Sequence, residues 1–291
     1  MKSPRDLRKL AVLILSSSLL STFIVSTTIV PALGQQSTPA PAIPSSGFAG
    51  LDRYRASRIA IFTDDFGQLA RYREADAVLK PPAPGENRVV FFGDSITDIW
   101  HLDEYFPGKA YLNRGIGGQI TGEMLGRMQA DVIELKPRLV LVLAGINDLG
   151  RGLAVSTIEN NLSMIADLAE AHHIEPMFAS VLPVSDYHKD VNPQYARTAR
   201  LAPAKILELN GWLKNFCEQR HFPYVDYYSA LVDKAGFLQA DLADDGLHPN
   251  AKGYRIMAPI ALAAIDNVAK LEVKPAKKKG GLREWLQKEH K

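Results

Sequence analysis

Two short segments of the chain carry the side chains that nucleophilic acyl transfer needs. Ser95 comes just past an apolar run that ends at Phe92, so we expect its hydroxyl at the start of a helix, near the positive end of the helix dipole. Asp245 precedes His248 by three residues, a spacing that lets the carboxylate hold the imidazole Nδ1–H and leave Nε2 as a base. A serine beside a carboxylate-supported histidine is typical of covalent catalysis on esters and related acyl compounds.

Two further segments can supply donors to a developing oxyanion. Gly118 lies in a glycine cluster, which lets the backbone approach a ligand closely and point N–H groups at it. The Asn147 amide can donate to an oxyanion, or it can cap the turn that follows it. Taken alone, Ser95 is better explained as a helix cap, and the glycines could form a phosphate nest, although they lack the usual phosphate-loop spacings. The order and placement of all four segments together indicate acyl-transfer chemistry.

Other polar side chains near these segments have structural interpretations. Asp94 and Asp148 are expected to fix their own loops through backbone hydrogen bonds. Tyr187 and His188 lie in a polar loop that is either simply exposed or lines the substrate pocket. No cofactor and no metal are expected. The chain has one cysteine, no HExxH spacing, and neither the GxGxxG nor the P-loop pattern of glycines.

These segments can meet only if the fold brings them to one edge of a sheet. Apolar runs predict five strands, at 88–92, 110–113, 139–143, 176–180 and 223–227. Amphipathic patterns predict helices at 52–79, 121–135, 156–172 and 204–219, with Ser156 as an N-cap. This alternation predicts an α/β fold with three α/β/α layers, flavodoxin-like, around a mostly parallel five-stranded sheet. Functional groups then gather beyond the carboxyl ends of the strands, where all the segments above are expected.

Four blocks of the sequence resemble those of the SGNH, or GDSL, hydrolases, and the resemblance extends over roughly 88–254. The blocks are Gly93–Ser95, Gly118, Gly145–Asp148 and Asp245–His248. The sequence segments NRGIGG, GIND and DGLHPNAKGY are most similar to those of the branch that includes platelet-activating-factor acetylhydrolase-like and bacterial lysophospholipase-like esterases. The chain has no GxSxG, which excludes the nucleophile elbow of the α/β-hydrolases as the source of the serine.

The resemblance implies the SGNH hydrolase fold and a role for each matching residue. Ser95 would be the nucleophile, His248 its base, and Asp245, in preference to Asp244, the group that orients His248. The backbone N–H groups of Ser95 and Gly118 and the side-chain amide of Asn147 would form the oxyanion hole. The neighbouring Gln119, where relatives often have Asp, would bear on the substrate edge.

Charge is distributed unevenly along the chain. Although 34 basic and 32 acidic residues give +2 overall, segment 1–34 carries +3 and segment 268–291 carries +5, so the body between them is acidic. Basic residues before a long uncharged apolar stretch predict a signal peptide over 1–34, with an uncleaved membrane anchor as the alternative. A Pro/Ser-rich linker follows at 35–47, then one hydrolase domain at 48–270 and a basic tail at 271–291. The tail is either simply solvated or makes a weak membrane or acidic-polymer contact. Nothing in the net charge indicates a nucleic-acid partner.

The sequence thus predicts a secreted or periplasmic serine ester hydrolase that acts on small-molecule, lipid or glycan esters, with short acyl groups such as acetyl favoured. An alternative is an O-acyltransferase or carbohydrate acetylesterase acting on cell-wall or extracellular polysaccharide. In the transferase, a sugar hydroxyl would intercept the acyl-enzyme in place of water. A third hypothesis is a non-catalytic binding module, although such a module has no need for Ser, Asn, Asp and His together.

Overall fold

The computed structural model describes residue 47 and residues 49–272. The chain divides into two units between Gly47 and Phe48, and the described residues after Gly47 belong to the second unit. The predicted signal peptide at 1–34, nearly all of the linker at 35–47 and the basic tail beyond 272 lie outside the described residues. Within the described part, no helix has the length and apolar character needed to span a membrane.

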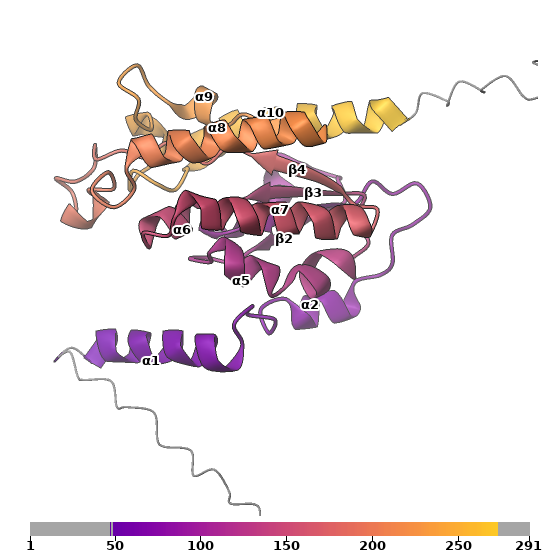
Figure 1. Cartoon of the computed structure of the whole chain (residues 1–291), viewed down its shortest axis with the longest axis horizontal. Coiled ribbons are helices and arrows are strands. Elements are labelled where there is room, and N and C mark those ends of the chain that lie inside the picture. The colour runs from indigo at the N-terminus through magenta and orange to yellow at the C-terminus, as the bar shows by residue number, and fades with distance from the viewer. Residues whose placement is uncertain (1–46, 48, 273–291) are drawn as a thin grey trace, which may run out of the picture. The chain divides into compact units, whose positions relative to one another are not determined.

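The centre of the fold is a five-stranded parallel sheet with the order β2-β1-β3-β4-β5 (Figure 1). Its strands are β1 (Val89–Gly93), β2 (Tyr111–Gly115), β3 (Leu139–Leu143), β4 (Glu175–Ala179) and β5 (Tyr224–Val225). The residues of β1 from Val89 to Phe92 are at most 2% exposed, as expected for a central strand covered on both faces. In the register, Gly93 pairs with Gly115 and with Leu143, so the carboxyl ends of β1, β2 and β3 are level.

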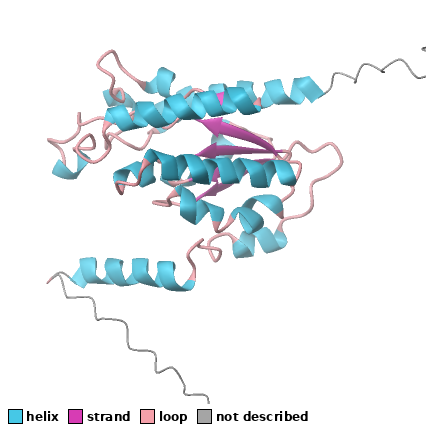
Figure 2. Ribbon diagram, in the orientation of Figure 1, coloured by secondary structure: helices cyan, strands magenta, loops and turns pink. Residues whose placement is uncertain are grey.

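Helices pack on both faces of the sheet and confirm the predicted α/β/α architecture (Figure 2). The α-helices of the described part of the chain are α1 (Ala49–Asp64), α2 (Arg73–Val78), α3 (Ser95–Asp98), α4 (Leu102–Tyr105), α5 (Thr121–Leu125), α6 (Ile146–Gly150), α7 (Val155–Ala171), α8 (Pro203–Arg220), α9 (Tyr228–Leu231) and α10 (Ala251–Glu272), of which α1 makes no extensive contact with the sheet. Helix α7 contacts α5 and α8, whereas α10 contacts α4. Right-handed crossovers place these two groups on opposite faces of the sheet.

Two of the predicted helices are interrupted. The segment 52–79 forms α1 and α2 with a turn between them, because the Asp65 carboxylate accepts the backbone N–H groups of Leu69 and Ala70 at 2.8 and 2.9 Å and so ends the helical pattern. The segment 121–135 forms only α5 and a π-helical turn, Gln129–Ile133. At the break, the backbones of Gly67 and Gly126 touch: a Cβ on Gly67 would lie 2.9 Å from the Gly126 carbonyl carbon.

Two helix ends also differ from the prediction. Helix α7 begins at Val155 with Ala154 as its N-cap, so Ser156 lies inside the first turn and is not the cap. Helix α10 was not predicted at all. It contains Pro259, and a proline inside a helical pattern normally predicts that the helix ends there. In the structure the helix continues through Pro259, which lies on its exposed side.

Helix α2 and the residue before it, Tyr72, contact the edge strand of the sheet. Strand β2 is an edge strand, and the Tyr72 hydroxyl donates to the Gly115 carbonyl at its carboxyl end. Asp76 of α2 forms an ion pair with Arg114 of the same strand. These contacts satisfy groups at an edge that would otherwise be open, and they hold β2 next to the loop that carries Gly118.

Candidate active site

Ser95 stands where β1 ends and α3 begins. The Asp94 carboxylate caps this short helix by accepting the Ile96 N–H at 3.0 Å. From the opposite side, the Tyr254 hydroxyl of α10 donates to the Ile96 carbonyl at 2.7 Å, while its ring stacks on Trp100 with centroids 5.0 Å apart. The sheet, the cap and α10 together fix the backbone that presents the Ser95 hydroxyl.

The structure brings Ser95, His248 and Asp245 together across 150 residues of sequence. His248 Nε2 lies 3.0 Å from Ser95 Oγ, and His248 Nδ1 lies 2.7 Å from Asp245 Oδ2. The other Asp245 oxygen accepts the backbone N–H groups of Leu247 and His248 at 2.9 and 2.8 Å. An ionised carboxylate can only accept, so His248 carries its proton on Nδ1 and turns the Nε2 lone pair toward Ser95.

The environment of Asp245 keeps its carboxyl group ionised. Partial burial acts to raise its pKa, but the hydrogen bonds from the His248 ring and from two backbone N–H groups outweigh burial, so the pKa falls well below its usual value. Asp245 is therefore ionised throughout the neutral pH range and remains an acceptor for the Nδ1 side of the His248 ring. Asp244, the alternative partner, instead accepts a hydrogen bond from the Asn250 amide at 2.9 Å.

Arg197 supports the triad, and sequence reasoning missed it. From the loop between β4 and α8, its Nε donates to the Asp245 carbonyl and its second guanidinium nitrogen to Asp245 Oδ2, both at 2.8 Å. The loop that carries Asp245 and His248 is also held at Gly246, whose carbonyl accepts the Ser185 N–H. The two backbones are so close that a Cβ on residue 246 would lie 2.2 Å from the Ser185 carbonyl oxygen. No motif marks an arginine 48 positions before its partner, so only the fold reveals this contact.

The three predicted oxyanion donors stand in the loops that follow β1, β2 and β3, at the carboxyl edge of the sheet. As the first residue of α3, Ser95 has an N–H without an intrahelical acceptor. Gly118 adopts a φ of 78°, and among the described residues its N–H has no acceptor. Asn147 donates one amide hydrogen to the Gln119 carbonyl at 3.0 Å, which leaves the second hydrogen for a ligand. The arrangement can therefore stabilise an oxyanion.

If Asn147 is one of these donors, Asn147→Ala is expected to lower kcat by about 10²–10³ and to change KM much less, because the lost hydrogen bond strengthens in the transition state. Steady-state kinetics on a p-nitrophenyl ester measure this split. Asn215→Ala, at an exposed position of α8, is the matched control. A kcat for Asn147→Ala equal to that of the control would remove Asn147 from the oxyanion hole.

The buried carboxylates Asp94 and Asp148 fix their loops, as predicted. Asp148 accepts the backbone N–H of Thr121 at 3.1 and 3.0 Å and its hydroxyl at 2.6 Å, which ties α6 to α5. Asp94 uses Oδ1 for the Ile96 N–H, whereas its buried Oδ2 has no hydrogen-bond partner among the described residues. Burial raises the pKa of Asp94 to about 7, although the Ile96 N–H and the neighbouring His248 act to lower it.

The raised pKa of Asp94 makes the stability of the fold depend on pH. Between about pH 4 and pH 7 the folded chain keeps a proton on Asp94 that the unfolded chain has released, so the free energy of unfolding falls as the pH rises. Asp94→Asn removes this titration. From about pH 5 to pH 7, the free energy of unfolding of wild type is expected to fall by on the order of 2 kcal/mol more than that of the variant. Urea unfolding of both proteins at each pH measures this difference. Parallel pH profiles for the two proteins would show that Asp94 does not titrate in this range.

Arg127 joins the ends of the strands that carry Ser95 and Gly118. Its side chain is fully buried and donates to the carbonyls of Gly93 and Arg114 at 3.0 and 2.8 Å, at the carboxyl ends of β1 and β2. Asp131 and Gln119 accept its remaining hydrogen bonds at 2.9 and 2.7 Å. Gln119 is only 1% exposed, so the expectation that it bears on the substrate edge is wrong: it orients a buried arginine.

The polar loop after β4 does not bring His188 to Ser95. His188 Nε2 lies 2.8 Å from the Ala240 carbonyl, and the Tyr187 hydroxyl donates to Asp233 at 2.6 Å. Neither residue lines the cavity beside the oxyanion donors. The described residues hold no cluster of three or more His, Cys, Asp or Glu side chains that could bind a metal ion.

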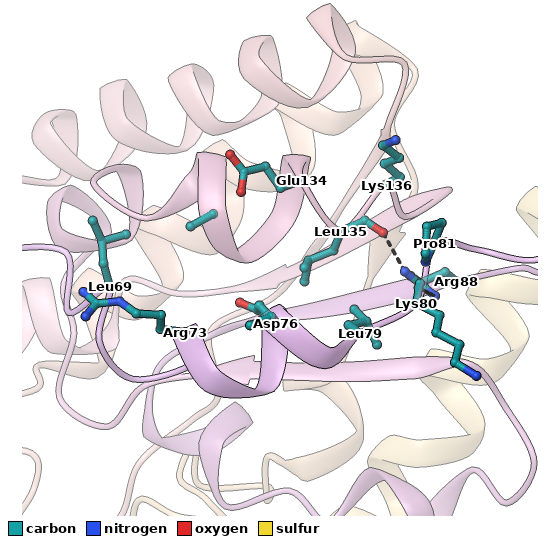
Figure 3. A pocket seen from close by; sticks show the side chains of 12 residues that line it. Leu69, Arg73, Asp76, Leu79, Lys80, Pro81, Arg88, Glu134, Leu135 and Lys136 are labelled. Carbon is teal, nitrogen blue, oxygen red and sulfur yellow. Dashed lines mark hydrogen bonds between the residues drawn. The ribbon is translucent and has the colours of Figure 1, made fainter.

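Two cavities differ in their relation to this chemistry. One of about 270 Å³ is bounded by Gly118, Asn147 and Leu247, directly beside the donors and the triad. A larger one of about 510 Å³ lies at the amino ends of the strands, between α2 and the π-helical turn, where Arg88 donates to the Leu135 carbonyl (Figure 3). Ser95 and His248 line neither of these two cavities, but Ser95 follows the carboxyl end of β1, so the smaller cavity is the one at its edge of the sheet.

The part of the chain that contains this site matches a known protein family and is similar to solved structures. The model of the GDSL-like lipase/acylhydrolase family matches residues 91–256, which include every residue of the predicted triad and the predicted oxyanion donors. A GDSL-like lipase from Bacteroides thetaiotaomicron is similar in structure, with a TM-score of 0.64 and 32% identity over 70% of this chain and 100% of that one.

Two curated relatives match at lower identity. The uncharacterized lipoprotein YqeF of Bacillus subtilis is 25% identical over 211 residues, which span 60% of this chain and 87% of that protein. The acetylxylan esterase of Geobacillus stearothermophilus is 23% identical over 210 residues, which span 61% of this chain and 93% of that protein.

Proposed function

The chain belongs to the GDSL-like lipase/acylhydrolase family and is a carboxylic ester hydrolase, and from this premise we propose that it hydrolyses short-chain esters through an acyl-enzyme on Ser95. The match confirms the family resemblance and the enzyme class predicted from the sequence. The observation that supports the mechanism best is the unbroken relay of 3.0 Å from Ser95 Oγ to His248 and 2.7 Å from His248 to Asp245.

In this mechanism His248 Nε2 takes the proton of Ser95 as the oxygen attacks the ester carbonyl. The carbonyl oxygen becomes negative and is held by the N–H groups of Ser95 and Gly118 and by the Asn147 amide. Collapse of the tetrahedral intermediate breaks the bond to the alcohol, and the imidazolium returns its proton to the leaving oxygen. Water, deprotonated by the same His248, then releases the acid and restores Ser95.

The proposed preference is for acetyl and other short acyl groups, on a substrate outside the cytoplasm. The acetylxylan esterase relative supports the acyl preference. The basic and apolar pattern of segment 1–34 and the lipoprotein relative support export. The same acetylxylan esterase favours one second candidate, a carbohydrate acetylesterase that acts on extracellular polysaccharide.

A panel of p-nitrophenyl esters tests the proposal: acetate, butyrate, octanoate and palmitate, each assayed with the full chain. We expect kcat/KM to be highest for acetate or butyrate and to fall at least about tenfold by octanoate, since each misfitting methylene costs about 1–3 kcal/mol of transition-state binding. A maximum at palmitate would overturn the short-chain preference. Release of acetate from acetylated xylo-oligosaccharides at a comparable kcat/KM would favour the carbohydrate acetylesterase.

A further inference from the structure

The cavity beside the oxyanion donors is bordered by three arginines, Arg151, Arg197 and Arg200. The other residues that line it are uncharged and include the apolar Ile146, Leu201 and Leu247, so no acidic side chain lines the cavity. Three arginines around one small cavity, whose lining also includes the predicted oxyanion donors Gly118 and Asn147, create a positive potential that low-dielectric walls concentrate.

The three charges are not equally compensated. Arg197 is paired with Asp245 at 2.8 Å, and Arg151 lies 3.6 Å from the buried carboxylate of Glu123. Arg200 is exposed, donates to the Gly150 carbonyl at 3.2 Å, and has no carboxylate within 4.0 Å among the described residues. The cavity therefore retains a positive charge that a neutral ester would leave unused.

The position of the cavity indicates which part of the substrate would carry the matching charge. Leu247 precedes His248, and Arg197 holds Asp245, so the cavity adjoins the side of the site where His248 protonates the leaving oxygen. A volume of about 270 Å³ is also far larger than an acetyl group needs. The alcohol part of the ester is thus the part that fits here.

Building on the proposed function, we infer that the preferred substrate is a short-chain ester of an alcohol that carries a carboxylate or phosphate group, and that Arg200, with Arg151, binds this anion. Arginine suits both anions because its planar guanidinium donates two parallel hydrogen bonds to a pair of oxygens. Hydrolysis releases the acid and the anionic alcohol, with the steps at Ser95 unchanged.

Three aryl acetates of similar shape test this inference on the full chain: 4-acetoxybenzoate, its neutral amide 4-acetoxybenzamide, and 4-acetoxyphenyl phosphate. At low salt we expect kcat/KM for at least one anionic ester to exceed that of the amide by about tenfold or more, as for a charge-assisted hydrogen bond. The preference should shrink as sodium chloride is added, because the cavity is open to solvent. Comparing the benzoate with the phosphate identifies which anion is bound.

Variants then locate the effect. Arg200→Gln is expected to lower the ratio of anionic to neutral kcat/KM by about tenfold, whereas Arg200→Lys, which keeps the charge, should retain most of it. Lys214→Gln removes an exposed charge of α8 outside the cavity and should leave the ratio unchanged. The salt dependence of wild type tests the inference independently of how the variants fold.

The possible failures are distinguishable. Hydrolysis of all three esters at similar kcat/KM, or a preference that survives both salt and Arg200→Gln, overturns the anion site and leaves the proposed esterase intact. If wild type hydrolyses none of the three acetates, the proposed short-chain esterase activity is wrong, and so is the anion site that rests on it.

Discussion

Ser95→Ala and His248→Ala are each expected to lower kcat for ester hydrolysis by about 10⁴–10⁶, because each removes one end of the proposed proton relay between Oγ and Nε2. Without Oγ there is no acyl acceptor, and without the imidazole the hydroxyl must lose its proton unaided. The double variant is expected to be no slower than either single variant, since the two groups act as one unit. Rates on p-nitrophenyl acetate measure all three proteins.

Matched controls separate chemistry from general damage to the fold. Ser156→Ala and His172→Ala alter exposed positions at the two ends of α7, and both should keep wild-type rates. Near wild-type activity in Ser95→Ala would mean that another nucleophile, or a directly activated water, carries the reaction. Additive losses in the double variant would mean that Ser95 and His248 act separately.

Asp245→Asn is expected to cost about 10⁴ in kcat near neutral pH while the geometry of the loop stays nearly the same. The new amide can donate to Nδ1, which favours the tautomer with the proton on Nε2, so that His248 faces Ser95 with a donor in place of its lone pair. The variant also loses the negative charge that stabilises the imidazolium and that compensates Arg197 at 2.8 Å.

The neighbouring carboxylate provides the control for this prediction. Asp244 bonds Asn250 and not the imidazole, so Asp244→Asn should remain within about threefold of wild type. The relevant measurement is kcat for both variants over the neutral pH range, together with a thermal melt to show that each is folded. If Asp244→Asn were the slower of the two, the assignment of Asp245 as the orienting group would be wrong.

The parts of this structure that could be predicted from the sequence are those governed by local pattern. β1 and β3 are unbroken apolar runs, and such runs in a chain of this kind are strands covered on both faces. Gly118 and the spacing of Asp245 and His248 are likewise local features, so their place at one edge of the sheet follows from the α/β order alone.

The remainder depends on contacts between distant segments. Arg127 and Arg197 reach carbonyls and carboxylates that are 34 and 48 positions away, and nothing in their neighbouring residues indicates those partners. The break after α5 has the same origin, because it arises where the backbone at Gly126 meets Gly67. Helix α10 shows the reverse case: packing of Tyr254 and its neighbours on the sheet outweighs the local cost of Pro259.

The role of Ser95 is tested most directly by covalent labelling with diethyl p-nitrophenyl phosphate, followed by peptide mass spectrometry and residual activity on p-nitrophenyl acetate. We expect one diethylphosphoryl group per chain, on Ser95, with a labelled fraction equal to the fraction of activity lost and with much slower labelling in His248→Ala. Labelling of a different residue, or complete labelling of Ser95 with activity retained, would contradict Ser95 as the nucleophile.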